Sequence, residues 1–304
     1  MSDHRIIFGD AAEVLRTLSE ESVDCVFTSP PYWNLRDYGA EGQIGLEATV
    51  GEYVERLVGV FAEVRRVLKP AGTVALVLGD SYNSTNGYCR AQPSWQRKGR
   101  AGGSADKQQV DDGILKPKDL VGVPWRVAFG LQCAGWWLRN DIIWQKLNPL
   151  PESVTDRFAA THEHVFLLSR SARYWFDLNA VRAEHRSAHA PGNQSRLYIQ
   201  RSRIPERLRP DQAHSFHPFG KNPGDVVALP AQPTPFAHSA TFPVGLVLRI
   251  LPALCPPRVC PQCGQAWQHV VAKTAEPAVT HKGSRFDCGK TGARDGGDRT
   301  QAGE

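Results

Sequence analysis

The chain has 304 residues, of which 41% are hydrophobic and 22% charged, and its formal net charge is +5. This length and composition suit a soluble enzyme of one large or two small domains, and they exclude a chain too polar to bury a core. No apolar run approaches the roughly 20 residues that span a bilayer, and the N-terminus lacks a signal-peptide pattern, so the sequence predicts a cytoplasmic protein with no membrane partner.

Strands and helices are expected to alternate from the N-terminus onward. Residues 5–9 (RIIFG) predict a short apolar strand, residues 11–18 a helix, and residues 24–28 (DCVFT) a strand that runs into Ser-Pro-Pro-Tyr. The later predicted elements are a helix over 50–68, a strand buried on both faces over 73–78, a helix near 124–134, and strands over 141–145, 164–168 and 174–176. This order is typical of an α/β fold with a parallel, doubly wound sheet, which binds ligands at the carboxyl ends of its strands.

Two basic stretches interrupt this pattern. Residues 83–118 and 182–209 are rich in lysine or arginine and lack apolar periodicity, so they are predicted to be long surface loops. Solvated charge would explain either loop alone. Two such loops on one chain favour a polyanion, because arginine suits phosphates and guanine edges. The sequence therefore predicts a nucleic-acid partner.

Ser29-Pro30-Pro31-Tyr32 lies at the carboxyl end of a predicted strand, where an α/β sheet binds its ligands. A bare Ser-Pro-Pro-Tyr is usually a turn or a polyproline segment, so its position is what favours a functional role. The Ser29 hydroxyl and the Pro30 carbonyl can each accept one N–H of an exocyclic base amine and localise the lone pair of its nitrogen. The prolines fix the backbone without adding a competing N–H, and Tyr32 offers a ring face to a base swung out of the duplex. The pattern predicts methylation of a base amine.

Several segments resemble, in order, those of the permuted (β-type) site-specific DNA amino-methyltransferases. Residues 28–39 (TSPPYWNLRDYG) resemble the fourth conserved motif of that family. The others are residues 6–15 (IIFGDAAEVL), 77–82 (VLGDSY), 148–169 (NPLPESVTDRFAATHEHVFLLS), and 222–225 with 238–246 (NPGD and HSATFPVGL). The resemblance covers most of residues 5–254. It implies a circularly permuted, doubly wound, Rossmann-like methyltransferase sheet that uses S-adenosylmethionine.

The resemblance also assigns roles to individual residues. The catalytic motif is Ser29, Pro30, Pro31 and Tyr32. The residues implied to contact S-adenosylmethionine are Asp10, Thr28, Phe242 and Pro243. Those implied to line the pocket for the flipped base are Asp80, His162 and Glu163. The arginines implied to contact double-stranded DNA are Arg196, Arg201, Arg203 and Arg207.

The same resemblance divides the chain into four regions. They are the catalytic part (residues 1–181), an Arg-rich target-recognition loop (182–221), a cofactor-binding helix segment (222–254), and a partial zinc-ribbon-like insert with a disordered tail (255–304). Within the family, serine as the first motif residue is associated mostly with N4-cytosine enzymes and aspartate more with N6-adenine enzymes. The expected reaction is therefore transfer of a methyl group to the N4 of cytosine, with N6-adenine as the alternative. A cognate restriction endonuclease is an expected partner.

A zinc ion is a second candidate ligand. Cys260 and Cys263 have the C-x-x-C spacing of half a zinc ribbon, but a structural zinc needs four ligands. Cys255, His281 and Cys288 form no second close pair, and the seven cysteines otherwise fit a reducing compartment. The pair His162–Glu163 with its neighbouring histidine could also suggest a metal site, although pocket lining or packing explains it as well.

The family pattern also includes a strand closing in a Gly-rich F-x-G-x-G turn after the motif at 238–246, and this chain does not contain it. The resemblance places that strand and the next between the strands at 5–9 and 24–28, so the expectation is a C-terminally truncated methyltransferase with a gap at the centre of its sheet. Two hypotheses follow: an active enzyme whose missing strands come from a second polypeptide, or an inactive remnant that only binds DNA. A zinc-ribbon nucleic-acid-binding module is a third.

Overall fold

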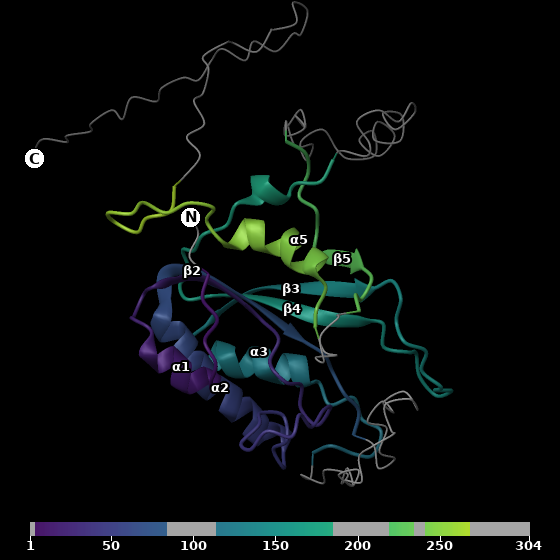
Figure 1. The fold of residues 1–304 in the computed structure, drawn as a ribbon. Coiled ribbons are helices and arrows are strands. Elements are labelled where there is room, and N and C mark those ends of the chain that lie inside the picture. The colour runs from purple at the N-terminus through teal and green to yellow at the C-terminus, as the bar shows by residue number, and fades with distance from the viewer. Residues whose placement is uncertain (1–3, 84–113, 185–218, 234–240, 268–304) are drawn as a thin grey trace, which may run out of the picture. The chain divides into compact units, whose positions relative to one another are not determined.

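The computed structural model describes residues 4–83, 114–184, 219–233 and 241–267, and Figure 1 shows them as a three-layer arrangement. A sheet forms the middle layer, and helices cover both of its faces. The helices on one face are α1 (Ala11–Thr17), α2 (Val50–Val67) and α3 (Val123–Cys133), and the helix on the other is α5 (Val244–Leu254). A short 3-10 helix, η2 (Leu178–Val181), packs against α5. The predicted DNA contacts Arg196, Arg201, Arg203 and Arg207 lie outside the described residues.

The sheet is five-stranded within the described residues, with the order β1-β2-β4-β3-β5. The strands are β1 (Val23–Thr28), β2 (Leu68–Leu78), β3 (Trp137–Lys146), β4 (His162–Ser169) and β5 (Val226–Leu229). β1 pairs with β2, and β3 with β5, in parallel, whereas β4 is antiparallel to both β2 and β3. The carboxyl ends of β1, β2, β3 and β5 therefore meet the amino end of β4 at one edge of the sheet, and this edge is where the predicted site residues begin.

Helix α2 shows how the local sequence specifies an element. Thr49 caps its first turn, with the Glu52 N–H donating to Thr49 Oγ1 at 3.2 Å and the Glu52 carboxylate accepting the Thr49 N–H at 3.0 Å. Its buried residues recur at helical spacing and form one apolar stripe: Val50, Tyr53, Leu57, Phe61, Val64 and Val67. That stripe packs α2 against the sheet.

The sheet separates two hydrophobic clusters. On the side of α2 and α3, the cluster contains Leu76, Leu78, Phe166 and Leu168 from the sheet. On the side of α5, it contains Val77, Trp144 and Val165 together with Leu246 and Ile250. Because neighbouring strand residues enter opposite clusters, β2 and β4 are buried on both faces.

Most predicted elements are confirmed, and two strands are wrong. Residues 5–9 form no strand, and Ile6 and Phe8 are 84% and 91% exposed. Residues 174–176 also form no strand, although the Trp175 N–H donates to the Ala71 carbonyl. The parallel sheet expected from the alternation of elements contains the antiparallel strand β4, and β5 was not predicted.

The expected gap at the centre of the sheet is also corrected. Since residues 5–9 do not join the sheet, β1 is its last strand on that side within the described part of the chain. The outer edge of β1 is therefore open, where the sequence had suggested an internal gap. None of the described helices is long and apolar enough to cross a membrane.

Candidate active site

The backbone that follows β1 is held in place by three hydrogen bonds. The buried Tyr53 hydroxyl, from α2, donates to the Pro31 carbonyl at 2.9 Å. The Trp33 indole N–H donates to the Glu47 carbonyl at 3.1 Å, and the Asn34 N–H donates to the Gly45 carbonyl at 2.7 Å. These bonds fix the Pro-Pro segment and the residues after it against α2 and the loop that precedes α2.

Replacing Tyr53 with phenylalanine is expected to lower the free energy of unfolding by about 1 kcal/mol, because the Pro31 carbonyl loses its donor while the buried ring stays packed. Urea denaturation of the wild type and the variant measures the difference. A variant as stable as the wild type would contradict the role of the Tyr53 bond.

A chain of polar side chains crosses the carboxyl edge of the sheet. The Ser29 hydroxyl donates to Tyr32 Oη at 3.2 Å, and the Tyr32 hydroxyl donates to Glu163 Oε2 at 2.7 Å. The Lys146 ammonium forms an ion pair with the other oxygen of Glu163, and its Nζ lies 5.1 Å from the centroid of the Trp144 ring. Burial, together with the neighbouring Glu163 carboxylate, raises the pKa of the Tyr32 phenol well above its ordinary value, so Tyr32 stays protonated.

Gly79 leaves room for this series of hydrogen-bonded side chains. It follows the last residue of β2, and a Cβ on it would lie 2.7 Å from Tyr32 Cε2 and 3.6 Å from Glu163 Cγ. The Tyr32 ring therefore passes over the end of β2 where no side chain stands. One part of the ring thus packs on Gly79. The stacking of Tyr32 on a flipped base stays a prediction.

Asp80 lies at the end of β2 and faces the first turn of α3. Its Oδ1 accepts the N–H groups of Ser81 at 2.8 Å and Val123 at 2.9 Å. Burial raises the pKa of the Asp80 carboxyl, and the two backbone donors oppose part of that rise. Asp80 therefore also holds the start of α3 in place, a role that its sequence context did not indicate.

The raised pKa of Asp80 predicts a pH-dependent gain from Asp80→Asn. A carboxyl whose pKa is higher in the folded than in the unfolded state favours folding while it is protonated, and this contribution is lost as the pH rises through the folded-state pKa. The variant has no such loss. Its unfolding free energy relative to wild type is expected to increase from about pH 4 to about pH 7. Urea titrations at both pH values measure it, and a difference that stays constant or falls would contradict the prediction.

The predicted pocket residues His162 and Glu163 lie on opposite faces of β4. His162 is on the side of α3, with its ring centroid 5.2 Å from that of His164. His164 Nδ1 lies 2.9 Å from Asp141 Oδ1, and its ring stacks on Phe166 at 5.7 Å. Sequence reasoning missed the His164–Asp141 pair and also Lys146. The alternating His-Glu-His pattern of a strand was the one signal that could have separated the two faces.

Two of the predicted cofactor residues lie beside the end of β1. The Phe242 ring centroid is 5.1 Å from that of Phe27, the residue before Thr28, and Pro243 is the buried N-cap of α5. The structure assigns Asp10 a capping role, with its Oδ1 accepting the N–H groups of Ala12 and Glu13 at 2.9 and 3.1 Å. Thr28, Phe242 and Pro243 thus share the edge where Ser29 begins.

Cys260 and Cys263 lie at the other end of the sheet. Lys69, at the start of β2, donates to the carbonyl of Gly264 at 3.4 Å, which places the C-x-x-C turn at the amino end of β2. Ser29 lies at the opposite edge, after the carboxyl end of β1. The backbone N–H groups of Cys263 and Gln262 lower the pKa of the Cys260 thiol, as in a tight C-x-x-C turn. No group of three potential metal ligands occurs among the residues that the structure places. Within the described residues the zinc prediction therefore has half a ligand set, and the other candidates His281 and Cys288 lie outside them.

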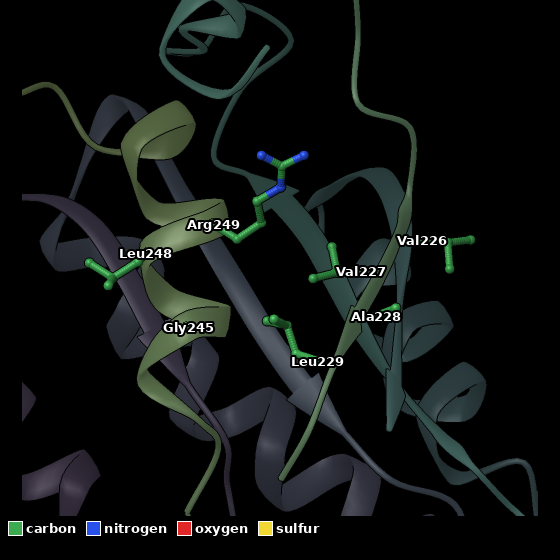
Figure 2. A pocket seen from close by; sticks show the side chains of 7 residues that line it. All are labelled: Val226, Val227, Ala228, Leu229, Gly245, Leu248 and Arg249. Carbon is green, nitrogen blue, oxygen red and sulfur yellow. The ribbon is translucent and has the colours of Figure 1, made fainter. Parts of the chain in front are cut away.

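Two hollows flank α5, and neither is lined by the catalytic motif. Figure 2 shows the first, of about 400 Å³, between β5 and α5, with Val227 and Leu229 directed toward the helix and Val226 directed away. Arg249 is its one charged lining residue. The second, of about 340 Å³, is lined by residues of α5, η2 and the sheet together with Asp225. The polar groups that could perform chemistry converge at the strand ends instead, so we place the candidate site there.

The chain is similar to known DNA methyltransferases. Type II methyltransferase M.XycI from Xanthomonas campestris pv. cyanopsidis is 52% identical over 174 residues, which are 57% of each chain, and M.SmaI from Serratia marcescens is 50% identical over 178 residues, 59% of this chain and 60% of that one. This chain thus spans less than two thirds of these relatives. Among solved structures, the PvuII DNA methyltransferase (cytosine-N4-specific) is 17% identical, with a TM-score of 0.49 over 82% of this chain and 69% of that one. A DNA methylase family model matches residues 23–259, so the chain belongs to the N6/N4 DNA methylase family.

Proposed function

We propose that this chain carries the base-binding and catalytic part of an S-adenosylmethionine-dependent DNA methyltransferase that acts on the exocyclic N4 of cytosine. The carrying observation is the position of Ser29 and the Pro30 carbonyl beside Tyr32 and Glu163, at the carboxyl ends of β1 and β2. The family, and the Type II methyltransferases that the chain resembles, support the reaction class.

The two acceptors suit an amine that must be made nucleophilic. Within the described part of the chain, Tyr53 occupies the Pro31 carbonyl, whereas the Pro30 carbonyl accepts no hydrogen bond. Pro30 and Ser29 therefore present one acceptor each to the two N–H bonds of the substrate amine. Pulling both hydrogens out of the base plane localises the nitrogen lone pair. The proton then leaves easily once the nitrogen carries a methyl group, so no strong base is required.

The cofactor-binding residues fit S-adenosylmethionine in part. This cofactor supplies a methyl group on a cationic sulfur and also carries an anionic carboxylate and an adenine. The N-cap residue of α5, Pro243, makes no side-chain cap bond, and the Val244 N–H donates to Gln232 Oε1 at 3.1 Å. The positive end of the helix suits a carboxylate. Phe242 offers an aromatic face next to it, and Thr28 lies at the adjoining strand end. Asp10 is left with Oδ2 for a ligand, because Oδ1 caps α1.

The substrate is proposed to be double-stranded DNA, bound through the 182–221 region with Arg196, Arg201, Arg203 and Arg207, and a cognate restriction endonuclease would recognise the same site. The open edge of β1 and the exposed Ile6 and Phe8 beside the N-terminus support pairing with further strands, which a second polypeptide carrying the F-x-G-x-G segment would supply. If no such strands are supplied, the edge of β1 stays unpaired, and the second candidate is an inactive remnant that only binds DNA.

The test uses genomic DNA from a host without DNA methylation, because such DNA contains every short target site. The purified chain and labelled S-adenosylmethionine are added, and the digested nucleosides are separated. We expect labelled N4-methylcytosine, which Ser29→Ala should form at least about 100-fold more slowly. Labelled N6-methyladenine would identify the alternative base, and salt-sensitive DNA binding without transfer would support the remnant.

A further inference from the structure

Lys146 is linked to Ser29 through two side chains, those of Glu163 and Tyr32. In the strand order, β2 and β4 lie between β1, which Ser29 follows, and β3, which ends at Lys146. The side chains of Lys146 and Glu163 are only 21% and 15% exposed, and Glu163 stands opposite Trp144 in the β3–β4 register. Lys146, two residues further on, reaches Glu163 diagonally on the same face. This is a half-buried ion pair aimed at Tyr32.

The ion pair determines the direction of the hydrogen bonds. An ionised carboxylate can only accept, so the single hydroxyl proton of Tyr32 goes to Glu163 at 2.7 Å. Tyr32 Oη can then only accept from Ser29, whose hydroxyl proton is donated in the 3.2 Å hydrogen bond. That contact is longer than the usual O–H···O distance of about 2.7–2.8 Å. What is left on Ser29 Oγ toward the site is a lone pair.

We propose that Lys146 and Glu163 are positioning residues that act through Tyr32 to make Ser29 Oγ an obligate acceptor for the substrate amine. A serine hydroxyl that is free to rotate can present its proton to the amine and oppose binding. The series of polar contacts from Lys146 to Ser29 prevents the Ser29 hydroxyl from turning its proton toward the amine, and each hydrogen bond polarises the next. This inference deepens the proposed function and rests on it for its catalytic consequence.

The kinetic test compares single and combined variants in methyl transfer to genomic DNA. Lys146→Met and Tyr32→Phe are each expected to lower kcat by roughly tenfold to 100-fold, with the KM for DNA within about twofold, because the acceptor geometry is lost while binding is retained. The kcat of the double variant should be no lower than that of Tyr32→Phe, since both substitutions interrupt the same series of hydrogen bonds. Lys146→Arg should restore most of the activity.

The controls separate this role from simple destabilisation. Lys69→Met removes a comparably buried lysine, paired with Asp24 at 2.8 Å at the other end of the sheet, and should leave kcat unchanged. Because Lys146→Met leaves a carboxylate unpaired, the neutral pair Lys146→Met/Glu163→Gln is made as well, and it should be as slow. A kcat equal to wild type in Lys146→Met and in Lys146→Met/Glu163→Gln would overturn the proposal. Effects of Lys146→Met and Tyr32→Phe that multiply in the double variant would also overturn it.

A second readout does not depend on catalysis. In protein labelled at tyrosine Cζ, the NMR signal of Tyr32 is identified by its loss in Tyr32→Phe. It is expected to shift in Lys146→Met, in Lys146→Met/Glu163→Gln and in Ser29→Ala, and to stay in place in Lys69→Met. If the wild-type chain transfers no methyl group, its proposed activity alone is contradicted and this spectrum decides the inference. An unmoved Tyr32 signal in the Lys146 variants overturns it.

Discussion

Replacing Ser29 with alanine is expected to lower the rate of methyl transfer by about 100- to 1000-fold, the usual effect of removing one preorganised hydrogen-bonding group from a transition state. The Oγ is one of two proposed acceptors for the amine, and its loss leaves the nitrogen lone pair conjugated with the ring. The fold should be almost unaffected, because Ser29 makes one long hydrogen bond, at 3.2 Å, to Tyr32.

Single-turnover transfer to genomic DNA, with enzyme in excess, measures the chemical step for this variant. Ser22→Ala is the matched control, since the exposed Ser22 hydroxyl bonds only the Ser19 carbonyl before β1. Equilibrium unfolding of both variants verifies that the fold is intact. A Ser29→Ala rate within about threefold of wild type would place the acceptor elsewhere, because the expected loss is at least 100-fold.

The elements that the sequence predicted well are those whose signal is local. The apolar run of β2 and the helical spacing of α2 lie within single stretches of chain. Helix α2 lies where it was expected, whereas β2 begins at Leu68, five residues before the run predicted over 73–78. Placing Ser29 at a strand end required only that β1 be recognised, so the position of the proposed catalytic motif could be predicted without tertiary information. These features depend on side chains close together in sequence.

The features that the sequence missed depend on partners far along the chain. Residues 5–9 are as apolar as β1, but a strand needs a neighbour for its N–H and C=O groups, and residues 5–9 do not pair with the open edge of β1. The bond between Tyr32 and Glu163 joins residues 131 positions apart, and no pattern near either residue announces it. Lys146 reads as an ordinary strand-end lysine until β4 is paired beside β3. Strand order therefore determines the polar chain, and spacing in the sequence does not.

Gly79→Ala is expected to displace the Tyr32 ring and to lower the free energy of unfolding by about 1–3 kcal/mol, the usual cost of overfilling a packed site. The added Cβ would stand 2.7 Å from Cε2 and 3.0 Å from Cδ2 of that ring. Gly79 does not have a left-handed backbone conformation, so the cost comes from the contact and not from the backbone. The displaced ring should also lose its bond to Glu163, and methyl transfer should fall to the level of Tyr32→Phe.

A double-mutant cycle isolates this contact. In a Tyr32→Ala background the ring is gone, so Gly79→Ala should cost almost nothing there, and the coupling between the two positions should amount to about 1–3 kcal/mol. Gly59→Ala is the control, since Gly59 lies within α2 with nothing within 4 Å of its added Cβ. There the same substitution should stabilise the helix by about 0.5–1 kcal/mol. If Gly79→Ala costs the same with and without the Tyr32 ring, then the glycine serves the backbone of β2, and the passage of Tyr32 toward Glu163 does not require it.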